Sequence, residues 1–240
     1  METLEPRADP GPTVAQAAPT LLDGQRLDQP TFHELYLRTP DDFRAELIDG
    51  VVHVMSSPVN PRHGRPDFNL AGFLYLYSSE TPGTTGQTNT TVQLGPGDEV
   101  QPDCALLIDP ESGGRTGEDP DGYTTGCPEL VVEISSSSLA LDRDAKRRLY
   151  EAAGALDYIV FDVPHRAILW FSIHEGRLSP MAIGADGLYR SRAFPGLWLD
   201  PDAFLRGDRR GVNEALRRGL DGPEHAAFID RLRANRANRP

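Results

Sequence analysis

The segment from residue 128 to residue 164 constrains the fold more than any other part of the chain. Residues 130–134 (LVVEI) form a short apolar run typical of a buried strand, and residues 156–164 (LDYIVFDVP) form a second one. Between them, residues 139–154 have the apolar periodicity of a helix and end at Gly154, a typical C-cap residue. A strand–helix–strand unit favours two parallel strands joined by a right-handed crossover. The expected fold class is therefore α/β with a central sheet.

The flanking segments add hairpins, which indicate that this sheet is mixed. Before the strand–helix–strand unit, we predict a short helix from Thr31, with Thr31 as its cap and Glu34 at the third position, and then a hairpin over residues 45–58 with Asp49-Gly50 as its turn. A helix over residues 60–80, with Leu70, Phe73, Leu74 and Tyr77 on one face, is followed by a Gly/Thr-rich loop over residues 81–87, a strand before a turn at Pro96-Gly97, a strand that opens at Asp103 and a polar surface loop over residues 110–125. After the unit, we predict a hairpin over residues 167–183 and one more short strand.

Composition divides the chain into three parts. Residues 1–29 are rich in Pro, Gly and Ala without an apolar period, so we predict a disordered leader. Residues 30–206 form the predicted folded domain, and residues 207–240 a C-terminal helix with an Arg-rich tail. That tail, residues 231–240, is expected to be disordered rather than to bind nucleic acid.

Charge and cysteine content limit the possible classes of function. The net charge of −12 argues against a simple nucleic-acid-binding protein, although a metal ion and a local arginine patch can reverse the field at one site. No apolar run is long enough to span a membrane, and the N-terminus lacks the features of a secretory signal. Two cysteines make neither a disulfide framework nor a zinc motif, which is typical of a cytoplasmic protein.

Two acidic residues are candidates for a metal site. Glu133 and Ser135 share one face of their strand, whereas Val132 and Ile134 face the other way, into the core. Glu133 can therefore point into a cleft at the carboxyl end of the strand. If the strand that opens at Asp103 is its neighbour, both carboxylates converge, and oxygen ligands of this kind suit Mg²⁺ or Mn²⁺. The alternative is that Asp103 only begins a strand and Glu133 pairs with an arginine.

A single lysine lies on the helix that follows. All but one of the 24 basic residues are arginine, and the exception is Lys146. Asp142, Lys146 and Tyr150 are spaced four apart, so they form one stripe whose start can overhang the same cleft. An ammonium there could steady the charge of a reacting phosphate. Alternatively, Lys146 has no functional role and forms an ion pair with Asp142 on the helix surface.

These motifs together resemble the Uma-two family of restriction-endonuclease-like proteins, within the PD-(D/E)XK nuclease superfamily. The resemblance covers roughly residues 31–205. The matching motifs are AELIDG, SSPVNPRHG, QPDCALLID, PELVVEISSSS, the D-x3-K-x3-Y helix, ALDYIVFDV and FPGLWLD.

The resemblance implies an αβββαβ core and a metal-dependent endonuclease that hydrolyses phosphodiester bonds in DNA. Asp103 and Glu133 would be its metal ligands, with the Ile134 carbonyl as a further candidate. The superfamily places a lysine two residues after the glutamate, where this chain has Ser135. The family is thought to use a lysine from the next helix instead, and here only Lys146 is available.

The chain departs from the family pattern at three places. Val51 and Gln101 stand where the family often has an acidic residue and an arginine, and four serines replace Ser-Pro-Ser-Thr. These departures motivate an alternative hypothesis, a catalytically inactive nuclease fold that serves as a binding or regulatory module. A glycosidase is a distant third interpretation, because paired carboxylates are common to both classes.

Several other residues have two open interpretations. Glu46 is either an outer-shell or third metal carboxylate or an ordinary strand-edge charge. His63 either approaches a phosphate or caps the helix at the surface. Tyr150 is expected to pack with its hydroxyl near the site, and a phosphate patch is possible at Arg143, Arg147 and Arg148. Cleavage of both strands would need two active sites, so a homodimer is plausible.

Overall fold

The structure is a computed structural model that describes residues 20–55, 60–136 and 141–238, without the side chains of residues 141–143. Residues 1–19 of the predicted leader lie outside the described residues. Residues 20–28 are ordered against the first hairpin, since Leu21 is buried and Arg26 forms a β-bridge to Val51. The prediction of disorder is therefore wrong for residues 20–28.

The central sheet is mixed, as the sequence predicts. Its order is β12-β11-β10-β9-β6-β3, and β9 and β10 are the parallel pair. Its strands are β3 (Thr84–Thr88), β6 (Cys104–Ile108), β9 (Leu130–Ser135), β10 (Asp157–Asp162), β11 (Ala167–His174) and β12 (Arg177–Pro180). The predicted crossover is thus confirmed, while β3 replaces the loop predicted over residues 81–87, because its backbone pairs along the whole of β6.

A second sheet in the order β2-β1-β5-β4-β8-β7 carries the first hairpin. Its strands are β1 (Ala45–Ile48), β2 (Val51–Val54), β4 (Val92–Gly95), β5 (Asp98–Val100), β7 (Gly117–Glu118) and β8 (Thr124–Thr125). The Asp49-Gly50 turn is confirmed, with positive φ at both residues, as a tight hairpin turn requires. A short pair, β13 (Tyr189–Arg190) and β14 (Trp198–Leu199), stands apart.

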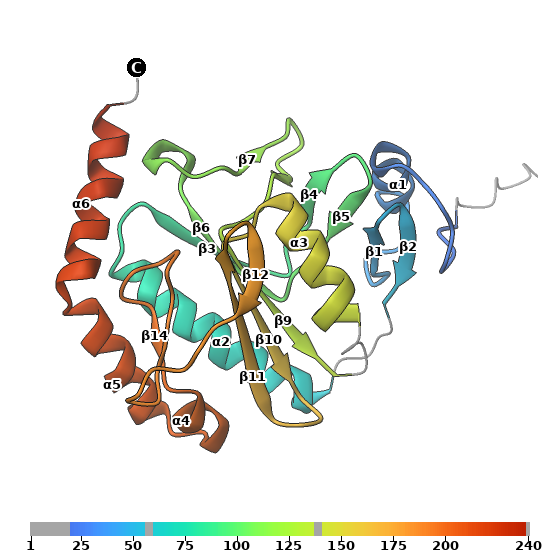
Figure 1. Cartoon of the computed structure of the whole chain (residues 1–240). Coiled ribbons are helices and arrows are strands. Elements are labelled where there is room, and N and C mark those ends of the chain that lie inside the picture. The colour runs from blue at the N-terminus through green and yellow to red at the C-terminus, as the bar shows by residue number, and fades with distance from the viewer. Residues whose placement is uncertain (1–19, 56–59, 137–140, 239–240) are drawn as a thin grey trace, which may run out of the picture.

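Helices cover both faces of the central sheet (Figure 1). They are α1 (Gln29–Tyr36), α2 (Pro61–Ser79), the 3₁₀ turn η1 (Pro110–Ser112), the π-helix η2 (Leu141–Lys146), α3 (Arg147–Ala153), α4 (Pro201–Arg206), α5 (Arg209–Leu220) and α6 (Pro223–Ala237). In Figure 1, α3 lies in front of β9–β11 and α2 behind them. The sheet is therefore buried on both sides.

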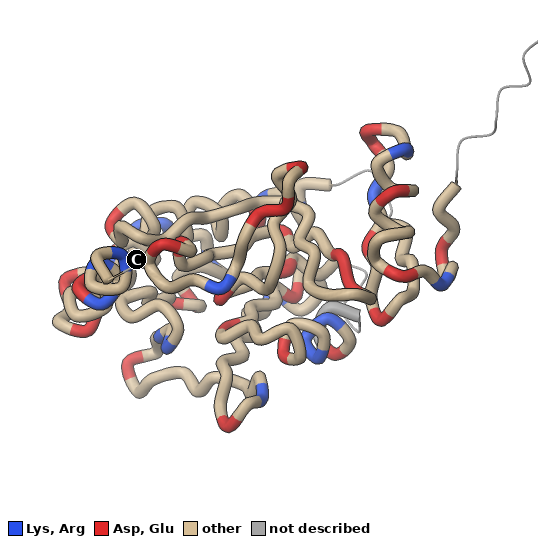
Figure 2. Tube along the Cα trace, turned by 90° about the horizontal axis from the view of Figure 1, so that it is seen from above, with Lys and Arg blue, Asp and Glu red and all other residues tan. Residues whose placement is uncertain are grey.

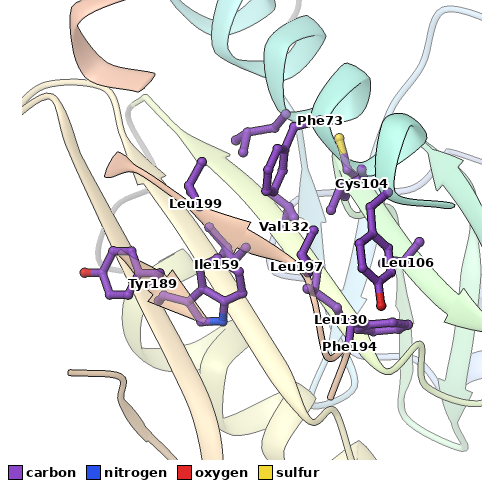
Figure 3. Packing of buried hydrophobic residues seen from close by; sticks show 14 of the residues in the cluster. Phe73, Cys104, Leu106, Leu130, Val132, Ile159, Tyr189, Phe194, Leu197 and Leu199 are labelled. Atoms are coloured by element: carbon purple, nitrogen blue, oxygen red, sulfur yellow. The ribbon is translucent and has the colours of Figure 1, made fainter. Parts of the chain in front are cut away.

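The main core lies between the central sheet and the helices on the α2 side (Figure 3). The inward face of α2 contributes Leu70, Phe73, Leu74 and Tyr77, as the sequence predicts. Side chains from β6, β9 and β10 meet this face, Val132 and Ile159 among them. Val131 and Val160 point the opposite way, into a second cluster with α3, because successive residues of a strand face opposite sides.

Three predictions about local structure need correction. The cap of α1 is Asp28, whose carboxylate accepts the Thr31 N–H, so Thr31 lies inside the helix. Residues 110–125 are not a plain loop, since they contain η1, β7 and β8. The Arg-rich tail is helical as far as Ala237, because Phe228 and Leu232 of α6 pack into the main core.

Arginines and acidic residues are interspersed along the trace (Figure 2). The net charge of −12 is thus spread over the fold rather than gathered in one acidic segment. Any site for an anionic substrate must therefore depend on a local arrangement of cations.

Asp157 gives a pH-dependent stability that can be measured. It is fully buried, and burial raises its pKa to about 6, although Ser191 donates a hydrogen bond to it. Since the folded pKa exceeds the unfolded one, this group stabilises the fold at low pH, and that contribution is lost as pH rises through about 6. We expect Asp157→Asn to gain about 2 kcal/mol over wild type between pH 4 and pH 7.

Urea unfolding followed by circular dichroism at both pH values measures this difference. Asp230→Asn, at an exposed position of α6, is the matched control and should show no such pH-dependent gain. A difference between Asp157→Asn and wild type that is the same at pH 4 and pH 7 contradicts the prediction.

Candidate active site

Asp103 and Glu133 come from neighbouring strands of the central sheet. Asp103 lies one residue before β6, which runs antiparallel to β9 with Cys104 opposite Val132. The Asp103 Oδ2 atom accepts the Ile134 backbone N–H at 2.6 Å. The expectation that the two strands are neighbours is therefore confirmed, and both carboxylates line one cleft.

Glu133 is 4% exposed and receives two donors on the same oxygen. Its Oε1 atom lies 3.1 Å from Lys146 Nζ and 2.8 Å from the Tyr150 hydroxyl. Burial, and then the charge of Glu133, raise the pKa of Tyr150 well above its ordinary value. The hydroxyl therefore stays protonated and holds the carboxylate as a donor.

Lys146 connects Glu133 to a third carboxylate. Its ammonium lies 3.0 Å from Glu46 Oε1 and 2.8 Å from Glu46 Oε2. Glu46 Oε1 also accepts the Gln101 backbone N–H at 2.8 Å. Both Glu46 and Lys146 are 1% exposed. The strand-edge and surface-pair interpretations of these two residues are therefore wrong.

This buried group of charges joins three elements. Glu46 lies on β1 of the second sheet, Glu133 on β9 of the central sheet, and Lys146 at the end of η2. Taking ions out of water costs several kcal/mol each, on the order of what a close counter-ion returns. Burying an ammonium between two carboxylates therefore adds little net stability to the fold. The ammonium also lies at the end of a π-helical turn, η2, and turns of this kind often occur at functional sites.

His63 contacts Asp103 rather than capping its helix. The His63 Nε2 atom lies 3.0 Å from Asp103 Oδ1, and both side chains are partly exposed at the cleft. The N-cap of α2 is Asn60, whose side chain accepts the Arg62 N–H. The capping interpretation of His63 is therefore wrong, and His63 fixes one oxygen of Asp103 while Ile134 holds the other.

A cleft with a volume of about 1490 Å³ opens above these residues. Asp103, Glu133, Lys146, Glu46 and His63 all line it. Its remaining charged lining comes from several distant segments of the chain: Asp23, Asp42, Arg44, Arg62, Arg65, Arg166 and Arg206. Arginines thus outnumber acidic residues around this part of the cleft, although the whole chain has a net charge of −12.

Some residues that the sequence analysis considered are not among those that line the cleft. The Arg147 guanidinium donates to the Leu178 carbonyl at 2.8 Å and lies over the Phe171 ring, so it takes no part in a phosphate patch. The side chains of Asp142 and Arg143 lie outside the described residues. Cys104 is a buried thiol, as expected, and burial raises its pKa far above the ordinary value.

Sequence reasoning missed the cations of the cleft wall. Arg166 lies in the turn between β10 and β11, and its guanidinium donates to the Leu205 carbonyl at 2.7 Å. Arg206 ends α4, about 40 residues further along the chain. No local pattern marks such residues, because only the packing of α4 against the central sheet brings these two arginines to one cleft.

The oxygen donors of the site fit a hard divalent cation. Among the described residues, no three His, Cys, Asp or Glu side chains surround a position for a metal ion. Mg²⁺ commonly takes one or two protein carboxylates and keeps several waters, so two carboxylates on one cleft are sufficient. Three carboxylates and one ammonium also leave two formal negative charges at the base of the cleft.

Fold and site together define an α/β protein of restriction-endonuclease-like architecture. The family model described as "Uma2: Putative restriction endonuclease" matches residues 30–202. Since this is well over half of the chain, the protein belongs to that family. None of the proteins with curated descriptions is significantly similar in sequence.

Solved structures support the same architecture. The chain is similar to a structure titled a putative nuclease belonging to DUF820, from Anabaena variabilis ATCC 29413. The TM-score is 0.52 at 12% sequence identity, over 83% of this chain and 97% of that one. Within the described residues, none of the helices has the length and apolar character needed to cross a bilayer.

The charge group at Lys146 predicts a strongly coupled effect on stability. Lys146→Met leaves two buried carboxylates without their counter-ion, so we expect a loss of about 3–5 kcal/mol in the free energy of unfolding. Adding Glu46→Gln removes one of these charges and should recover part of the loss. Urea unfolding of the two single variants and the double variant measures this coupling.

Arg148→Met is the matched control, because Arg148 is an exposed cation two residues further on. Its expected effect is within about 0.5 kcal/mol. If Lys146→Met were no more destabilising than Arg148→Met, the ammonium would not neutralise the buried carboxylates.

Proposed function

We propose that this protein is a metal-dependent endonuclease that hydrolyses phosphodiester bonds in DNA. The observation that carries the proposal is the buried Lys146 ammonium between Glu46 and Glu133, beside Asp103, at the base of one cleft. Membership of a family described as a restriction endonuclease supports the same reaction class.

Asp103 and Glu133 would hold Mg²⁺ or Mn²⁺, with the Ile134 carbonyl as a further oxygen donor. When bound, such an ion polarises the phosphoryl group and lowers the pKa of coordinated water. The protein's own part is to keep the two carboxylates in place. His63 and the Ile134 N–H hold Asp103, while Tyr150 and Lys146 hold Glu133.

Lys146 would stabilise negative charge on the phosphate during the reaction. Two carboxylates contact its ammonium, so the cation has counter-ions on both sides. Because Glu46 and Glu133 fix the position of Nζ, little reorganisation is needed when charge develops on the substrate. This arrangement supplies the cation that Ser135 cannot provide at the usual superfamily position.

The arginines of the cleft support a polyanionic substrate. Arg62, Arg65, Arg166 and Arg206 line its walls, whereas the acidic residues near the reacting phosphate lie at its base. Phosphate contacts made by arginine contribute affinity without base specificity. The cleft can therefore attract a nucleic-acid backbone in spite of the overall negative charge of the chain.

We expect Mg²⁺-dependent nicking of supercoiled plasmid DNA by the wild-type protein. Asp103→Asn and Glu133→Gln remove a charge at nearly constant shape, and each should reduce the rate at least about 100-fold. Gel electrophoresis over time measures the rate, with circular dichroism to establish folding. Asp230→Asn is the control and should cleave normally. Undiminished cleavage by the folded Asp103 and Glu133 variants would exclude the proposed site.

A catalytically inactive binding module is the competing hypothesis, and metal binding discriminates between the two. An ion present at ten times its dissociation constant adds about 1.4 kcal/mol to stability, which raises the melting temperature by a few degrees. We expect this rise with millimolar Mg²⁺ or Mn²⁺ in the wild type and its loss in Asp103→Asn. Calorimetry measures it, and a wild-type chain without any metal-dependent shift would favour the inactive module.

A further inference from the structure

The outward face of α2 is apolar and lacks charge. Residues 68–79 contain no Asp, Glu, Lys or Arg, in a chain of which 25% is charged. Phe68, Tyr75 and Leu76 are 75%, 71% and 42% exposed on this face. Three large apolar side chains on one exposed helix face are uncommon in a monomer and mark an interaction surface.

Gly72 lies in the middle of this face. A Cβ atom added at Gly72 would meet no atom within 4 Å, so the backbone there is open to another molecule. The glycine has no packing purpose within its own fold, and it costs helix stability relative to alanine. A second helix could approach closely at this point, with Phe68 on one side of the crossing and Tyr75 and Leu76 on the other.

We propose that the outward face of α2 binds the same face of a second copy of this chain. In an antiparallel pair that crosses at Gly72, each residue lies opposite the one equally distant from Gly72 in the other copy. Phe68 then faces Leu76 of the second copy, and Gly72 faces Gly72. One two-fold axis satisfies both contacts, as a symmetric dimer requires.

The charges at the two ends of α2 favour this occupant. Arg65 is exposed near the start of the helix, at the rim of the cleft that it also lines, and Glu80 is exposed just after its end. The antiparallel pair brings Arg65 of each copy towards Glu80 of the other, while the centre remains free of charge. Two chains with a net charge of −12 repel one another elsewhere, so a neutral centre with complementary ends suits self-association.

The size of the face predicts a weak dimer. Aromatic side chains bury roughly 150–250 Å² each, so the three exposed side chains contribute about 400 Å² per copy. With the flanking polar residues, the total approaches the lower limit of about 1,200 Å² for specific interfaces. Exchange between monomer and dimer is therefore expected at micromolar concentration. Because α2 begins at the cleft with His63, the dimer has one cleft at each end of the paired helices.

Sedimentation velocity of the full chain over a range of concentrations tests the proposal. We expect the average mass to rise from 26.3 kDa towards twice that value. Gly72→Glu places two carboxylates opposite each other and should weaken the dimer at least about 10-fold. The same variant should melt no lower than the wild type, because glutamate is the better helix former and fits without a clash.

Two further sets of variants test the face and the register. Asn213→Glu adds the same charge at an exposed position of α5 and should leave the dimer intact. Arg65→Glu and Glu80→Arg should each weaken the dimer, and the double variant should restore it. Gly72→Cys should form an intermolecular disulfide on oxidation, since the native Cys104 and Cys127 are both buried.

Either of two results would overturn the proposed dimer. A mass of one chain at every concentration up to roughly 200 µM would mean that another molecule, or the chain's own residues 1–19, occupies this face. A dimer that persists in Gly72→Glu would lie on a different surface. Neither result depends on nuclease activity, so the dimer and the proposed reaction can fail separately.

Discussion

The buried ammonium of Lys146 is the interaction on which the rest of the site depends. It neutralises charge on Glu46 and Glu133, which come from two different sheets. Without a cation between them, two buried carboxylates would lack the counter-charge that offsets their loss of water. One compact ammonium with three donors reaches both carboxylates from a single atom, Nζ. The only lysine of a chain that otherwise uses arginine thus lies at this buried ion-pair position.

The two faces of β9 have different roles: one packs in the main core, and the other contributes to the site. Val132 and Ile134 bury their side chains in the main core, and Glu133 lies on the opposite face with Lys146 and Tyr150. Since helices cover both faces of the central sheet, Glu133 is enclosed although the cleft reaches it. Rigid surroundings of this kind hold charged groups in fixed positions, as the proposed reaction would require.

Distribution of charge, rather than its total, governs what this protein can bind. Arginines of the cleft wall lie close to acidic residues at its base, the arrangement on which the proposed binding of a metal ion and a phosphate backbone rests. The uncharged outward face of α2 offers a different kind of surface, which fits an apolar partner. Both features exist within a chain of net charge −12, which by itself would predict neither.

Sequence patterns predicted the crossover of β9 and β10, the Asp49-Gly50 hairpin and the inward face of α2, because each follows from local periodicity or turn chemistry. They also selected Asp103, Glu133, Lys146 and Tyr150. The strand β3, the continuation of the C-terminal helix through residues 231–237, the contact of His63 with Asp103 and the arginines of the cleft could not be predicted. These depend on groups far apart in the chain. By itself, the sequence determined which residues could take part, and only the tertiary structure decided which ones meet, because burial and ion pairing act through space.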